Sequence, residues 1–128
     1  MRLLPAFAAL VLCAGPVYAD EEKDKLSVGH GIICDTPEQA LRFVTLRNAG
    51  SETSQALLVI NREAASPTAC GPAIVAFRVE EEVHDSRLLD QRVRVMKVVV
   101  RAISNGGQWA PVPDIVQYAL VAPEGTEI

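Results

Sequence analysis

The sequence has few aromatic residues, few histidines and, after its first nineteen residues, no apolar run long enough to cross a membrane. It contains one Trp, two Tyr, three Phe and two His among 128 residues. A membrane-spanning helix needs about 20 consecutive apolar residues, so we expect no span beyond the N-terminal segment. So few aromatic rings also argue against a stacking platform for nucleic-acid bases, because the core takes its share of them first.

Positive charge is in short supply as well. The chain has 12 Lys and Arg residues against 16 Asp and Glu residues, which gives a formal net charge of −4. Nucleic acids and anionic membrane surfaces attract basic patches. The charge balance therefore argues against both as partners.

The sequence patterns of common catalytic sites are missing too. There is no G-x-S-x-G segment to place a serine nucleophile, and neither histidine has an evident serine partner. The Gly106-Gly107 pair precedes an expected edge strand rather than a helix, so it does not form a phosphate-binding loop. We therefore predict no enzymatic activity and no cofactor.

The first nineteen residues, MRLLPAFAALVLCAGPVYA, have the three parts of a secretory signal peptide. Arg2 supplies the positive start, Leu3–Leu12 the short apolar run, and Ala19 ends a small-residue cleavage pattern. We predict cleavage after Ala19 and a periplasmic or secreted protein. Two alternatives stay open: lipidation at Cys13, which the large residue before it disfavours, and an uncleaved membrane anchor.

The cysteines that remain after cleavage are Cys34 and Cys70. Because thiols usually pair in an oxidising compartment, we predict a disulfide between them. The chain-entropy model assigns such a bridge roughly 4 kcal/mol of stabilisation. The alternative is a thiol-active Cys34, since it lies just before an expected helix start, where a thiol pKa is lowered.

The clearest local signal is the segment TPEQ at 36–39. Thr36 is a good N-cap, proline suits the first helical position, and Gln39 can complete a capping box. A helix is therefore expected from here to about Gly50. A second helix is expected from Thr53 to about Ala65, where Ser-Pro stops it.

Strand patterns flank these helices. They are expected at Leu26–Cys34, Ala73–Val83, Arg92–Ser104, Gln108–Val112 and Ile115–Val121. Prolines confine the fourth of these to an edge, and a change of phase in the third predicts a β-bulge or a strong bend near Val95. The predicted fold class is α+β: two N-terminal helices followed by a small, bent, mostly antiparallel sheet resembling half a barrel. The predicted parts of the chain are a signal peptide (1–19), a charged tether (20–25), one domain (26–122) and a polar tail (123–128).

Two sets of side chains could carry chemistry or contacts. Trp109 is the preferred ligand-contact residue, with Arg94 and Arg101 beside it, because an interface often centres on an exposed tryptophan. The opposing interpretation makes Trp109 a plug at the end of a small core. Metal binding is less favoured, and its candidate ligands are His30, His84, Glu82 and Asp85.

Two stretches, VGHGIICDTPEQALRFV and INREAASPTACGPAIVAF, together resemble a group of short exported bacterial proteins. In that group a CDT-x-EQ segment is followed by a PTACG segment and a β-rich tail. The resemblance implies export and a paired Cys34 and Cys70, and it implies no mechanism.

The function expected from the sequence is a small, exported, non-enzymatic binding or adaptor module stabilised by one disulfide. Its expected partner is another envelope protein or a peptide. The alternatives are a structural or stress-related envelope protein, or a small metal-dependent or thiol-active protein. The oligomeric state and the ligand are left open.

Overall fold

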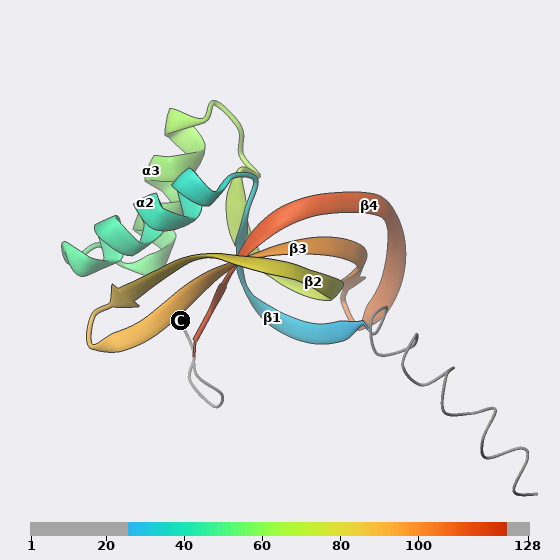
Figure 1. Cartoon of the computed structure of the whole chain (residues 1–128). Helices are drawn as coiled ribbons and strands as arrows, with labels where there is room; N and C mark the ends of the chain where they lie inside the picture. Colours follow the sequence, from blue (N-terminus) through green and yellow to red (C-terminus); the bar gives the residue numbers. More distant parts are fainter. Residues whose placement is uncertain (1–25, 123–128) are drawn as a thin grey trace, which may run out of the picture.

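A computed structural model describes residues 26–122 of the chain (Figure 1). The expected signal peptide and charged tether lie outside the described residues, as does the expected polar tail. Two helices and four strands follow one another within residues 26–122, in the order β1 (Ser27–Cys34), α2 (Pro37–Asn48), α3 (Thr53–Glu63), β2 (Cys70–Leu88), β3 (Gln91–Asn105) and β4 (Gln108–Val121).

The expected arrangement of two N-terminal helices before a half-barrel sheet is wrong. β1 comes before both helices and pairs antiparallel with β2 over its whole length, from Ser27 opposite Phe77 to Cys34 opposite Cys70. The helices are thus an insertion between two paired strands. The sheet also closes: its antiparallel strands follow the order β1-β2-β3-β4, and Cys34 pairs with Tyr118 of β4.

Closure was missed because the two prolines near the end of the chain suggested separate strands. The expected strands Gln108–Val112 and Ile115–Val121 are one continuous strand, β4. Its pairing with β3 skips forward between Val100 opposite Ile115 and Ala102 opposite Pro111. Such a bulge lets one strand bend sharply without ending, so β4 turns through the proline segment and goes on to meet β1.

The capping box predicted at the start of α2 is confirmed. The Thr36 backbone N–H donates to Gln39 Oε1 at 3.1 Å, and the Gln39 N–H donates to Thr36 Oγ1 at 3.1 Å. The helix begins at Pro37 and buries Phe43 and its neighbours against the sheet. Here the sequence pattern and the structure agree because capping depends on four adjacent residues alone.

The apolar side chains form two cores, one on each face of the curled sheet. The helices and one sheet face enclose the first core, which consists of Ile32, Cys34, Ala40, Phe43, Val44, Ala56, Ile60, Cys70, Leu88, Val93, Val95 and Leu120. The second core lies on the opposite face, which the sheet itself encloses, and centres on Val75, Val98 and Val100.

These two cores explain the change of phase in β3. Val93 and Val95 belong to the helix-side core, whereas Val98 and Val100 belong to the core inside the sheet. Successive side chains of a strand point to opposite faces, so the apolar positions change phase where β3 passes from one core to the other. Pairing of β3 with β4 is unbroken from Arg94 to Val100. The expected bulge exists, but its extra residue is on β2, where pairing skips between Glu82 and His84 opposite Met96 and Val95.

Candidate functional site

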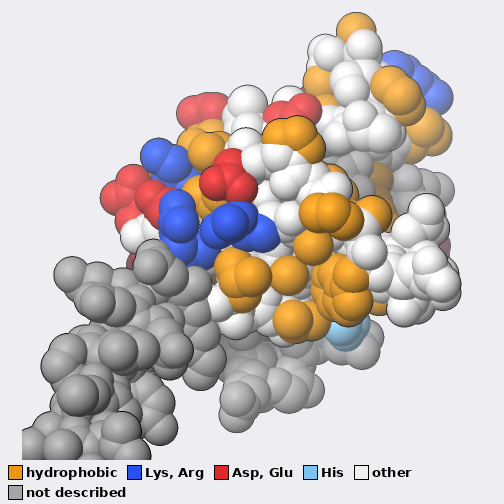
Figure 2. Space-filling model, turned by 90° about the vertical axis from the view of Figure 1, so that its right-hand side faces the viewer, with side chains coloured by type: hydrophobic (Ala, Val, Ile, Leu, Met, Phe, Trp, Pro, Cys, Tyr) orange, Lys and Arg blue, Asp and Glu red, His pale blue; other side chains and the backbone are white. Residues whose placement is uncertain are grey.

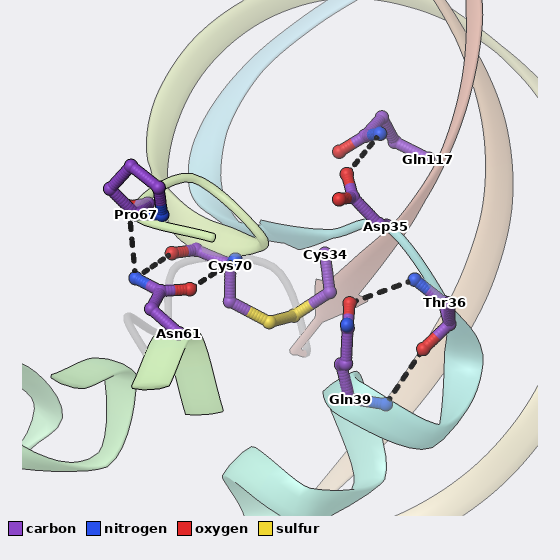
Figure 3. Close-up of a disulfide and its surroundings, with 8 residues drawn as sticks. All are labelled: Cys34, Asp35, Thr36, Gln39, Asn61, Pro67, Cys70 and Gln117. Atoms are coloured by element: carbon purple, nitrogen blue, oxygen red, sulfur yellow. Dashed lines mark hydrogen bonds between the residues drawn. A yellow bond between two sulfur atoms is a disulfide. The ribbon is translucent and has the colours of Figure 1, made fainter. Parts of the chain in front are cut away.

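The Cys34–Cys70 disulfide is present, as predicted, and joins the end of β1 to the start of β2 (Figure 3). The two residues are directly opposite in the β1–β2 register, and their exposed fractions are 0% and 1%. With both sulfurs bonded and buried, no free thiol lies at the start of α2. The bridge therefore serves as a clamp at the base of the inserted helices.

Asn61 of α3 holds the strand beside this bridge (Figure 3). Its Nδ2 donates to the carbonyl oxygens of Pro67 and Cys70, both at 3.1 Å, while the Cys70 N–H donates to Asn61 Oδ1 at 2.8 Å. A side-chain amide has both donors and an acceptor, so it can satisfy the backbone of the first β2 residue completely. The sequence analysis missed this residue, since a single asparagine in a helical pattern gives no signal of a distant backbone partner.

The two acidic metal candidates are paired with arginines. Arg92 donates to Asp85 at 2.6 Å, and Arg94 lies 3.5 Å from Glu82. The hydrogen bond from Arg92 holds the pKa of the Asp85 carboxyl below its usual range. Among residues 26–122 no group of three or more His, Cys, Asp or Glu side chains is placed to hold a metal ion.

The two histidines are not brought together. His30 of β1 lies opposite Ile74, while His84 lies opposite Val95. Ile74 and His84 are ten residues apart on β2, about 30 Å along a strand. The strand register therefore keeps the two histidines apart, and they do not share a cleft.

Trp109 is at the hairpin between β3 and β4, and 48% of it is exposed. It lies opposite Ser104. Arg101 is three residues from Ser104 and forms an ion pair with Asp114 at 2.8 Å. Arg94 is ten residues from Ser104, about 30 Å along β3, so the structure places only one of the two predicted arginines near the tryptophan.

A row of apolar residues crosses all four strands near Trp109, and the sequence analysis did not identify it. Val28 lies opposite Ala76, Ala76 opposite Ala102, and Ala102 opposite Pro111. Val28 is 66% exposed. The row is invisible in the sequence because its members are far apart in the chain and only the strand register aligns them.

This row belongs to a larger surface, which we term the distal face, made up of Val28, Ile74, Ala102, Trp109 and Pro111; Ala76 lies in the row but is buried. Side chains two residues apart on a strand share a face, so Val28 is on the same face as Ile32 and Cys34, which the helices cover. The distal face is thus the part of that face that extends beyond the helices. Figure 2 views the molecule from this end and shows apolar side chains gathered beside a group of charged ones.

Comparison of the chain with protein-family models, curated proteins and solved structures found no match. Within residues 26–122 neither helix has the length and apolar character needed to cross a membrane. The functional argument therefore rests on the surface geometry.

Proposed function

We propose that this chain is an exported, non-enzymatic binding module that docks a protein partner on its distal face. The observation that carries the proposal is the exposure of apolar side chains from separate strands on one surface: Val28 is 66% exposed and Ile74 47%. Apolar side chains that gather on the surface of a small domain commonly mark an interaction site.

Trp109 and Arg101 have the properties of an anchor and a rim. Tryptophan contributes a large rigid area with an indole N–H, and it is enriched among the residues that dominate binding energy. Arg101 of β3 has no opposite residue on either neighbouring strand. The pairing of β3 with β2 passes directly from Val100 to Ala102, and so does its pairing with β4. A bulge residue of this kind directs its side chain away from the regular rows.

The disulfide supports the exported location, because such bridges persist in oxidising compartments. A structural or stress-related envelope protein without a specific partner is the competing function. It requires no exposed anchor, and the exposed Trp109 favours the binding module. Arg94 is not part of the proposed surface.

Site-specific photocrosslinking in the cells that make the protein tests this function. A benzophenone amino acid at position 109 should form one discrete adduct with a partner protein, and the same group at Thr45, exposed on α2, should not. The adduct should weaken when Val28→Lys is added, since a buried lysine at an apolar contact is costly. The unmodified protein from the same cells should have the mass of a chain that starts at Asp20 with no free thiol.

Two outcomes would contradict the proposal. Equal crosslinking from positions 109 and 45 would mean that the distal face is not preferred. An adduct that Val28→Lys leaves unchanged would mean that Trp109 contacts its partner without the apolar row.

A further inference from the structure

The two edges of β1 differ in how much of each is paired with a neighbouring strand. Every residue of β1 pairs with β2, but within the described residues only Ile33 and Cys34 pair with β4. The barrel is therefore closed at one end of β1, where the Leu120 carbonyl of β4 still lies beside Gly31. Among residues 26–122, no strand pairs with the same edge of the first four residues of β1, Ser27 to His30.

The hydrogen-bond alternation identifies which backbone groups are on that edge. The Asp35 N–H donates to the Ala69 carbonyl at 2.8 Å, which continues the β1–β2 ladder by one residue. In an antiparallel pair, residues that exchange hydrogen bonds alternate with residues whose N–H and C=O groups point the other way. The β1–β2 register is unbroken, so every second residue before Asp35 also bonds to β2. Val28 and His30 lie between these residues, and their N–H and C=O groups therefore point away from β2.

β1 lacks the features that usually protect such an edge. Proline, lysine and other charged side chains discourage the addition of a further strand, and SVGHGIIC contains none of them apart from a histidine. β4 offers the contrast, since the part of it before Tyr118, which does not pair with β1, carries Pro111 and Pro113, which have no N–H to donate. One free edge is thus blocked and the other is left able to bond.

We propose that the free edge of β1 binds an extended, uncharged segment of a partner protein as an added β-strand. This inference rests on the proposed function and names the form of its partner. The backbone groups of Val28 and His30 supply the hydrogen bonds, and only another extended backbone has donors and acceptors at the matching spacing. Alternate side chains of the added strand then lie on the distal face beside Val28, which is why the partner needs apolar residues at every second position.

Amide hydrogen exchange followed by NMR tests the proposal on the oxidised, signal-free chain. The probe is an acetylated nine-residue peptide in which threonine and valine alternate between two terminal lysines. In its presence the amides of Val28 and His30 should exchange about tenfold more slowly or better, because they gain hydrogen bonds. The amides of Gly29 and Gly31 already bond to β2 and should change little. The same peptide with proline at its centre is the matched control and should protect neither set.

Substitutions at one position separate the backbone from the side chain. His30→Pro removes an edge N–H without removing a β1–β2 hydrogen bond, and it should abolish peptide binding, whereas His30→Ala keeps the N–H and should bind within about threefold of the parent. Thermal unfolding verifies that both variants are folded, and Val28→Pro replaces His30→Pro if that variant is not.

Four results would overturn the proposal. Val28 and His30 amides that are as protected as Gly29 and Gly31 before peptide is added would mean that the edge is already covered. Peptide binding that survives His30→Pro would place the contact elsewhere. Protection that appears with rising protein concentration alone would assign the edge to a second copy of this chain. A Trp109 crosslink without edge protection would refute strand addition while leaving the binding module intact. Edge protection without a Trp109 crosslink would instead refute docking on the distal face while leaving strand addition intact.

Discussion

At the scale of single residues, Asn61 links the helices to the sheet. Its three hydrogen bonds hold the backbone at Pro67 and at both polar groups of Cys70, where β2 begins. Neither of those groups is near water, because Cys70 is buried. A buried backbone group without a partner costs free energy comparable to a lost hydrogen bond.

We predict that Asn61→Ala lowers the free energy of unfolding by about 2 to 4 kcal/mol, because it leaves the Cys70 N–H and C=O without their partner. Asn48→Ala is the control, since Asn48 also bonds the backbone, to Arg87 and Leu89, but at an exposed place where water can replace it. Urea unfolding of both variants measures the difference. Equal costs would mean that burial beside the disulfide adds nothing to the Asn61 contacts.

At the scale of elements, the sequence predicts what is encoded locally. The α2 start could be read from four residues because each cap partner is three positions from the other. Strand β4 could not, because a proline pair within one strand looks the same in sequence as a break between two. The phase change in β3 was likewise visible, but its cause was not, because two cores contact the strand in turn and neither is contiguous in the sequence.

Removal of the α2 cap should be measurable. Thr36→Ala should lower the free energy of unfolding by about 1 kcal/mol, because the Gln39 N–H loses its acceptor at the helix start. Thr45→Ala is the matched control, an exposed threonine in the same helix whose hydroxyl bonds Leu41 within the helix. It should change stability by less than about 0.5 kcal/mol. A Thr36→Ala variant with the same denaturation midpoint as the control would contradict the role of the cap.

At the scale of the whole molecule, the helices are inserted between two strands that are paired and bonded at the point of insertion. Neither the closure of the barrel nor the distal face could be predicted from the sequence, since both arise from pairing between residues such as Val28 and Ala76, 48 positions apart. The pairing of the cysteines could be predicted, because the expected cleavage leaves two cysteines, and two cysteines in the expected oxidising compartment allow one intramolecular bridge.

Replacement of both cysteines should test how much the fold depends on its bridge. Cys34→Ala with Cys70→Ala should lower the free energy of unfolding by about 2 to 5 kcal/mol, because the unfolded chain without the bridge has a higher conformational entropy. The double serine variant should be less stable still, since its hydroxyls are buried at these positions. Reduction of the parent protein gives an independent measurement, and a denaturation midpoint unaffected by reductant would refute the stabilising role.

The bridge also determines what happens when the chain is cut. Cys34 and Cys70 flank the helical insertion in the sequence, and the exposed turn between α2 and α3 lies between the two cysteines. A protease that cleaves once in this turn adds a water molecule but releases no fragment, because the two pieces stay joined covalently through sulfur. In a compartment rich in proteases, the molecule therefore tolerates a break at its outermost turn, and it comes apart only where reductant is also present.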